Sequence, residues 1–119
     1  MTADDVSRLL RELWPESPDV KVRLTGRYNR RSAGRYYAPW GRRRVGLISI
    51  SDRFPWGDQY PPDVLRRIAV HEFAHHVHFV CVGAQKYAKS HAAHGRVWRG
   101  YHRLLEAGAT GVGVTGARG

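Results

Sequence analysis

Two histidines and a glutamate with the spacing of a zinc site lie near the middle of the chain. The segment His71-Glu72-Phe73-Ala74-His75 has the pattern HExxH. Residues four apart lie one helical turn apart on nearly the same side, so both imidazoles can face one metal ion while Glu72 lies on the adjoining flank. Two imidazole nitrogens and a neighbouring carboxylate are typical of a hydrolytic zinc site. The pattern therefore predicts such a site on a helix.

The next two histidines of the same predicted helix do not complete the ligand set. A catalytic zinc ion usually takes three protein ligands and leaves one position for water. His76 follows His75 by a rotation of about 100° and points away from the ion. His78 is in phase with His71 but lies almost a further turn along the axis, so it cannot converge with the other two unless the helix bends. A third ligand must come from another segment.

Three histidines after the helix are candidates for the third ligand. His94 has the most favourable context, because it precedes Gly95 at the start of a predicted helix. Trp98, four residues further on, can pack beneath His94 and fix its position. His91 and His102 stay open as alternatives, since a returning chain could bring either of them back to the ion. The expected metal ligands are His71, His75 and one of these three, with His94 preferred.

The helix that carries the two histidines has clear boundaries in the sequence. Pro61, Pro62 and Asp63 are typical of a helix start, and Gly83 is typical of an end. The spacing predicts a helix over residues 62–82, and its mostly apolar neighbours indicate that it is buried. Residues 84–93 fit either a helix or a loop. A last helix is predicted over 95–107, followed by a flexible glycine-rich tail over 108–119.

The remaining elements come before this helix. An apolar face with helical spacing predicts a helix over residues 4–14. Alternating apolar and polar residues from Val20 predict a half-buried strand, residues 35–38 a second strand, and residues 45–51, apolar on both faces, a third and well-covered strand. We therefore expect an α+β fold with a three-stranded, mainly antiparallel sheet. With 119 residues the chain fits one domain, expected over residues 1–107.

The charge of the chain is unbalanced. Twenty Lys and Arg residues against ten Asp and Glu give a net charge of +10. Between Asp19 and Asp52 there is no acidic residue, while nine cations and four tyrosine or tryptophan residues alternate there. This pattern is typical of a nucleic-acid-binding surface, and it also fits a solvated hairpin. We expect nucleic acid to bind through the segment from Lys21 to Arg44.

The composition of the chain also indicates in which cellular compartment the protein is found. The single cysteine, Cys81, excludes an intrachain disulfide and a four-cysteine zinc ribbon. Asp4 and Asp5 stand where a secretory signal has basic residues, and no apolar run approaches the roughly 18 residues of a membrane span. A cytoplasmic location without membrane insertion is expected.

The chain resembles a known family at these motifs. His71-Glu72-x-x-His75 followed by His94-Gly95-x-x-Trp98 is similar to the SprT-like zinc metalloproteases, whose pattern is HExxH followed by HGxxF or a similar aromatic residue. The order of the upstream elements also matches, so the resemblance covers roughly residues 5–107. Many members carry a cysteine zinc ribbon after the core. This sequence has none, so the resemblance is to a minimal version of the core.

The resemblance implies a zincin-like fold, a Zn²⁺ cofactor and peptide-bond hydrolysis. His71, His75 and His94 would be the metal ligands, and Glu72 would be the general base that activates a zinc-bound water. The strand over 45–51 would lie at the edge of the cleft and pair with an extended substrate. Family members that act on DNA-bound proteins are drawn to DNA, which the charge of this chain suits. Candidates for stabilising the developing oxyanion are Tyr87, Tyr101 and Arg35.

Two other interpretations are compatible with the same residues. The chain could be a nucleic-acid-binding module in which zinc is structural, which requires a fourth protein ligand. The candidates for that ligand are Cys81, His78, His91 and His102. The chain could also be a catalytically inactive relative that keeps the motif. Both would bind nucleic acid without cleaving protein.

Overall fold

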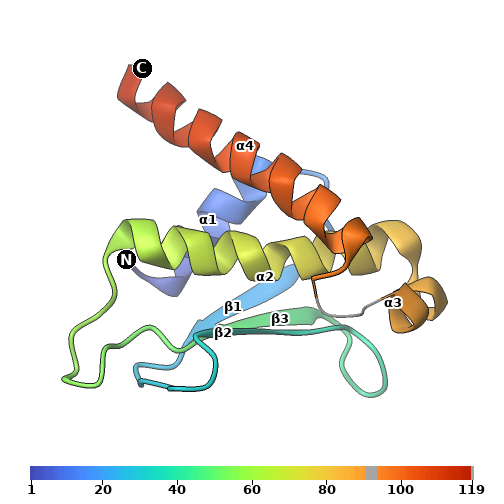
Figure 1. Ribbon diagram of the computed structural model, residues 1–119, viewed down its shortest axis with the longest axis horizontal. Coiled ribbons are helices and arrows are strands. Elements are labelled where there is room, and N and C mark those ends of the chain that lie inside the picture. Colours follow the sequence, from blue (N-terminus) through green and yellow to red (C-terminus); the bar gives the residue numbers. More distant parts are fainter. Residues whose placement is uncertain (91–93, 119) are drawn as a thin grey trace.

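The computed structural model describes residues 1–90 and 94–118, which form an α+β fold with four helices and a three-stranded sheet. This confirms the expected fold class. The helices are α1 (Ala3–Leu13), α2 (Pro62–Val82), α3 (Ala84–Ser90) and α4 (Arg96–Arg118), and the strands are β1 (Val20–Leu24), β2 (Gly34–Tyr37) and β3 (Gly46–Ile50). Helices α1, α2 and α4 all lie on one side of the sheet (Figure 1). None of the described helices is long and apolar enough to cross a membrane.

The sheet is mixed, which corrects the prediction of a mainly antiparallel one. The strand order is β1-β3-β2, with β3 in the centre. β3 runs antiparallel to β2, its neighbour in sequence, and parallel to β1. The reason is that the chain passes from β1 to the far edge, forms β2, and then turns back to place β3 in the gap. The central position agrees with the apolar residues on both faces of β3, of which Ile48 and Ile50 are fully buried.

Helix α2 passes through the centre of the molecule and contacts the other helices and the sheet. Its apolar side chains form the core together with residues of α1, β3 and α4. The fully or almost fully buried members are Val6, Leu10, Ile48, Ile50, Leu65, Ala69, Val70, Phe73 and Ala74. Because α2 is enclosed in this way, polar side chains along it must find partners or face a cleft.

A capping box forms the start of α1. Thr2 accepts a hydrogen bond from the Asp5 backbone N–H, and the Asp5 carboxylate accepts one from the Thr2 N–H. The same bonds lower the pKa of Asp5. Two otherwise unpaired N–H groups are thereby satisfied, which stabilises the start of α1.

The last helix is longer than the sequence predicts. Helix α4 continues to Arg118, past the expected end at Ala107 and through the segment predicted to be a flexible tail over 108–119. No proline interrupts this segment. Gly108 lies where α4 passes close to α1, since a Cβ there would be 3.3 Å from Leu13 Cδ2. At this position the glycine permits the close approach of two helices.

Candidate metal centre

Helix α2 carries the first two histidines of the site. It begins after Pro61, with Pro62 and Asp63 in its first turn, and ends at Gly83, whose φ is +82°. His71 and His75 lie one turn apart on the same side, with ring centroids 5.5 Å apart. Both side chains are partly buried, so α2 presents two imidazoles at the edge of the core.

His94 reaches the same point from the segment before α4. Its Nε2 lies 2.8 Å from Nε2 of His71. His71, His75 and His94 each offer one ring nitrogen, and these three nitrogens lie within 4.8 Å of one another. Such a group could hold one metal ion, and it contains the three histidines expected from the sequence.

The backbone of His94 is strained. Its φ is +60°, in the left-handed region, and it is the one non-glycine residue with positive φ in the described part of the chain. A residue with a Cβ adopts this conformation at a cost of about 1 to 2 kcal/mol. Strain of this kind persists where surrounding structure over-determines the conformation, and such positions cluster at functional sites.

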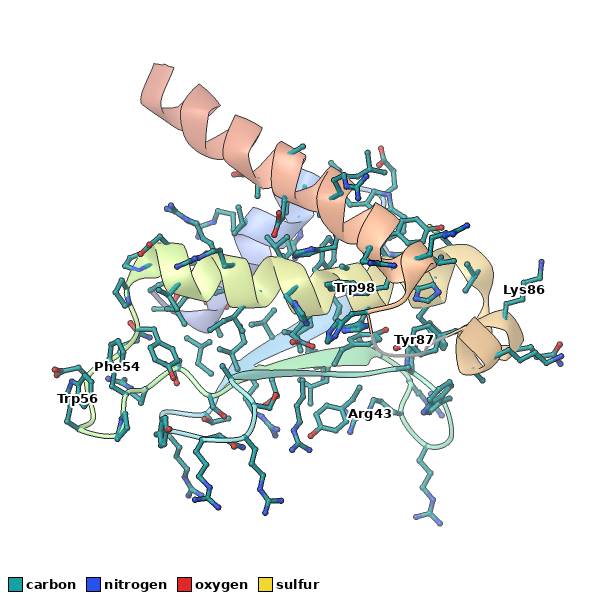
Figure 2. The ribbon with its side chains drawn as sticks, in the orientation of Figure 1. Arg43, Phe54, Trp56, Lys86, Tyr87 and Trp98 are labelled. Atoms are coloured by element: carbon teal, nitrogen blue, oxygen red, sulfur yellow. The ribbon has the colours of Figure 1, made fainter. Side chains whose placement is uncertain are left out.

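The ring of Trp98 packs against all three histidines. It is 6% exposed and lies between α4 and α2 (Figure 2). Its ring centroid is 4.5 Å from that of His94, 4.7 Å from that of His71 and 5.2 Å from that of His75, on which it stacks. The aromatic residue four positions after His94 therefore packs against all three imidazoles, as well as beneath His94 as the sequence suggests.

Glu72 lies beside the histidines with its side chain buried. The residue is 6% exposed, and its Oε2 is 3.9 Å from His71 Nε2. Burial raises the pKa of Glu72 to about 7. A carboxyl group with this pKa can both accept and release a proton near neutral pH.

Burial and neighbouring charges keep His71 neutral. Its pKa is lowered to about 4, mainly by burial and then by the nearby His94 and His102. A metal ligand must be the neutral imidazole, since the protonated ring has no free lone pair. The environment therefore favours the form of His71 that binds a metal ion.

A cleft of about 540 Å³ opens at these residues. Strand β2 and the residues before it form one wall, with Ser32 and Gly34, and α2 forms the other. All three histidines and Glu72 line it. The resemblance to the SprT-like family predicts that the strand over 45–51 lies at this edge of the cleft. The structure corrects this, because β3 is the central strand and β2 is the strand at the cleft.

Gly34 allows β2 to lie close to Glu72. A Cβ at this position would be 2.8 Å from Glu72 Oε2 and 2.8 Å from Ile68 Cγ2. Cβ atoms essentially never come this close to other atoms, so only glycine fits here without movement of a neighbour. No pattern in the sequence singles out Gly34, because a lone glycine next to the strand predicted over 35–38 does not indicate a close contact with a distant helix.

The other two candidates for the third ligand have different positions. His102 stacks on Trp98, and its Nε2 lies 2.9 Å from Glu106 Oε1. It is near His71 but outside the group of three. His91 lies outside the described residues. Among the described residues the group contains no fourth ligand from Cys81, His78 or His102, which are three of the four donors that a closed structural zinc site could use.

His76, which is not explained by the sequence pattern, anchors three elements. It is 1% exposed. Its Nε2 lies 3.2 Å from the Pro18 carbonyl, which can only accept, so Nε2 carries the proton and Nδ1 accepts from the Tyr36 hydroxyl at 3.0 Å. Ser17 Oγ is 3.0 Å from the same Nε2. These bonds connect α2 to β2 and to the segment before β1, so the role of His76 is structural.

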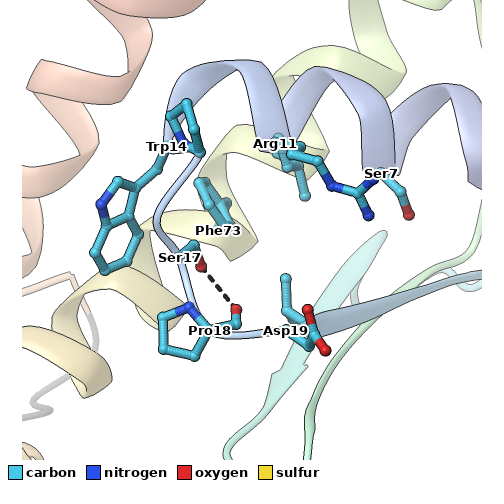
Figure 3. Close-up of a pocket in the computed structure, with 10 residues that line it drawn as sticks. Ser7, Arg11, Trp14, Ser17, Pro18, Asp19 and Phe73 are labelled. Atoms are coloured by element: carbon cyan, nitrogen blue, oxygen red, sulfur yellow. Dashed lines mark hydrogen bonds between the residues drawn. The ribbon is translucent and has the colours of Figure 1, made fainter.

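A smaller cavity lies beside this segment. It measures about 130 Å³ and lies between α1 and the start of β1, with Phe73 of α2 at its inner wall (Figure 3). The Ser17 hydroxyl at its edge donates to the Pro18 carbonyl at 2.8 Å. None of the three clustered histidines lines this cavity, so it is separate from the candidate metal centre.

The three candidates for stabilising an oxyanion differ in their surroundings. Arg35 is exposed and lies opposite Ser49 in the register, on the face of β2 that points away from α2. Tyr101 stacks on His78, with ring centroids 6.0 Å apart. Tyr87 is 6% exposed, and its pKa is raised by burial and then by the charge of Glu72. Of the three, Tyr87 is the one whose hydroxyl is influenced by Glu72.

Comparisons with protein-family models, with curated proteins and with solved structures find no match to this chain. The candidate metal centre is therefore defined by its own residues and their geometry alone.

Proposed function

We propose that the protein is a zinc-dependent metallopeptidase. The observation that carries this proposal is the convergence of His71, His75 and His94 beside the buried carboxyl group of Glu72 in an open cleft. Three nitrogen ligands and no fourth protein ligand within the described residues fit a catalytic zinc site better than a structural one. The resemblance to the SprT-like metalloproteases supports the same activity.

Glu72 has the position and the pKa of a general base. A zinc ion bound here would act as a Lewis acid and make water acidic enough to lose a proton near neutral pH. Glu72 would take this proton as the water oxygen attacks the scissile carbonyl, and would then deliver it to the leaving amine. Its raised pKa suits both steps. Tyr87, Tyr101 and Arg35 are all absent from the residues that line the cleft, so none of them is assigned to the developing oxyanion.

Strand β2 offers a free edge to an extended substrate. Ser51 N–H donates to Ala33 C=O at 2.7 Å, so Ala33 and every second residue after it direct their polar backbone groups toward β3. The N–H and C=O of Gly34 and Tyr36 therefore point to the open edge. A polypeptide in the cleft could pair there through its backbone, which would give cleavage with little side-chain preference.

The proposed substrates are proteins associated with DNA. The net charge of +10 favours a polyanionic environment, and the resemblance points to DNA-bound proteins.

Metal content and cleavage together test the proposal. We would measure zinc per chain and the cleavage of a DNA-binding protein with flexible tails, with and without single-stranded DNA. Glu72→Gln should keep zinc and lose cleavage, whereas Glu12→Gln on the exposed side of α1 should change neither. His94→Ala should lose zinc, and His102→Ala should retain it. Cleavage by Glu72→Gln would refute the mechanism, and zinc without cleavage in the unaltered protein would favour a structural zinc module.

A further inference from the structure

One face of the sheet is left uncovered by the described helices. Helices α1, α2 and α4 pack on the other side, and loops alone border the open face (Figure 1). We call this open side the outer sheet face and define it by Lys21 and Arg23 of β1, Arg35 and Tyr37 of β2, and Ser49 of β3. An open sheet face in a small domain is a large flat surface that is available to a partner.

The strand register arranges these residues in two rows. Ser49 lies between Arg23 and Arg35, and Leu47 lies between Lys21 and Tyr37. Arg23 donates from Nε and Nη2 to Ser49 Oγ at 3.3 and 3.0 Å. The first row therefore holds two guanidinium groups on either side of a hydroxyl, and the second holds an ammonium group and an aromatic ring.

The positive charge of the chain is concentrated in the segment that forms the sheet and its connecting loops. Residues 20–51 contain nine cations and no acid, whereas the rest of the chain has eleven cations and ten acids. Within the described residues, the recorded ion pairs of arginines with carboxylates involve Arg8, Arg53 and Arg67. None of the nine cations is among them. Their charge is not neutralised by the fold and is available to an anionic partner.

Aromatic rings accompany the cations. Tyr37 is 37% exposed, with the Arg43 guanidinium 5.1 Å from its ring centroid. Figure 2 shows Arg43 on the side of the sheet away from the helices. Tyr28, in the loop after β1, is 45% exposed. Exposed rings among arginines suit unpaired bases, because a base can stack on a ring while its phosphate contacts a guanidinium group.

We propose that the outer sheet face binds single-stranded nucleic acid. The cations would track the phosphates, and Tyr37 and Tyr28 would stack with bases. A duplex offers its phosphates but keeps its bases stacked internally, so it would use the charges and not the rings. This inference does not depend on the peptidase activity, because it concerns a surface remote from the histidines.

The two surfaces can be occupied together. Gly34 and Arg35 are consecutive in β2, and side chains of consecutive strand residues point to opposite faces. Gly34 borders the cleft, whereas Arg35 belongs to the outer sheet face. If the proposed peptidase activity holds, a bound strand would leave the cleft open while keeping the enzyme next to proteins on the same nucleic acid.

Binding can be tested without any measurement of cleavage. We would titrate a labelled 20-nucleotide oligothymidine with the full chain and follow fluorescence anisotropy at several salt concentrations. The double variant Arg23→Gln/Arg35→Gln should weaken binding at least tenfold and reduce the slope of log affinity against log salt by about 1.4, since each phosphate contact contributes about 0.7. Tyr37→Leu should weaken binding about tenfold. The matched control, Arg66→Gln/Arg103→Gln on exposed helix positions, should change the affinity less than twofold.

Binding to two other anionic ligands is compared with binding to oligothymidine. A duplex of the same length and vesicles containing anionic phospholipid would be titrated in parallel. Stronger binding to duplex or to vesicles than to oligothymidine would overturn the proposal, as would equal losses in the double variant and its control. Circular dichroism of each variant would establish that it is folded.

Discussion

Replacing Gly34 by alanine tests how closely β2 must approach Glu72. The added Cβ would be 2.8 Å from Glu72 Oε2, 2.8 Å from Ile68 Cγ2 and 2.9 Å from Glu72 Cγ. Ordinary contacts of a Cβ begin at about 3.4 Å, so the strand or the side chains must move by about 0.6 Å. Because the obstruction comes from two residues of a packed helix, it cannot be relieved by rotating one flexible end.

The expected loss is measurable in both stability and activity. Overpacking of this kind typically costs about 1 to 3 kcal/mol. For a domain of this size that lowers the melting temperature by about 4 to 12 °C. If Glu72 is the general base, a displacement of this size would reduce cleavage by about tenfold to a hundredfold. Zinc content should not change, because Gly34 contributes no ligand.

A second glycine provides the control. Gly100 lies in α4, and a Cβ there would meet nothing within 4 Å. Alanine is favoured over glycine in helices, so Gly100→Ala should stabilise the protein by about 0.5 to 1 kcal/mol. Thermal unfolding, zinc analysis and peptide cleavage would be measured for both variants. If Gly34→Ala were as stable and active as the unaltered protein, the proposed close fit between β2 and Glu72 would be wrong.

Zinc binding, the His76 network and pH give three further predictions. Zinc at one hundred times its dissociation constant should stabilise the protein against unfolding by about 2.7 kcal/mol, and His94→Ala should abolish this gain in a thermal melt. His76→Phe leaves the Tyr36 hydroxyl without its acceptor, whereas the Pro18 carbonyl keeps its bond from the Ser17 hydroxyl. The variant should lower the free energy of unfolding in urea by about 1 to 3 kcal/mol, and an unchanged value would contradict the assigned role. Below about pH 6.5 in the metal-free protein, the unfolded chain binds protons at two histidines before the folded one does, because burial lowers the pKa of His76, and that of His71 to about 4. Glu72 acts in the opposite sense, because its pKa is raised to about 7 and the folded chain binds that proton first. Two histidines against one carboxyl group should give a net loss of stability between pH 7 and 5, and Glu72→Gln should make that loss steeper; a gain in stability over this range would refute the reasoning.

Local patterns in the sequence were sufficient to predict the candidate metal site. Helical periodicity alone places His71 and His75 on one side of α2. The third member, His94, was favoured by its place before a helix and by Trp98 four residues later, and the structure brings these residues together. Within the His71–His75 pair and within the His94–Trp98 pair the residues are only four positions apart, so the local sequence indicates how each pair is arranged, whereas the contact between the two pairs spans 23 residues. The roles of the residues as ligands and base stay predictions until metal and activity are measured.

Long-range features could not be predicted in the same way. The strand order β1-β3-β2 depends on which strands pair across the sheet, and the alternation of residues in each strand is the same for either order. His76 belongs to a network whose partners, Ser17 and Tyr36, lie 59 and 40 residues away in the sequence. Gly34 is required by a contact with a helix that begins almost thirty residues later. These contacts exist only after the chain has folded.

Strand β2 combines the features on which the proposals depend. On its inner face, Gly34 permits close contact with Glu72, and Tyr36 bonds to His76. On its outer face, Arg35 and Tyr37 belong to the basic surface. Its open edge carries backbone groups that no described strand pairs with, although the Gly34 carbonyl accepts a hydrogen bond from the Ser32 hydroxyl at 2.6 Å. A shift of this strand would therefore alter the position of the base, the substrate edge and the nucleic-acid surface together.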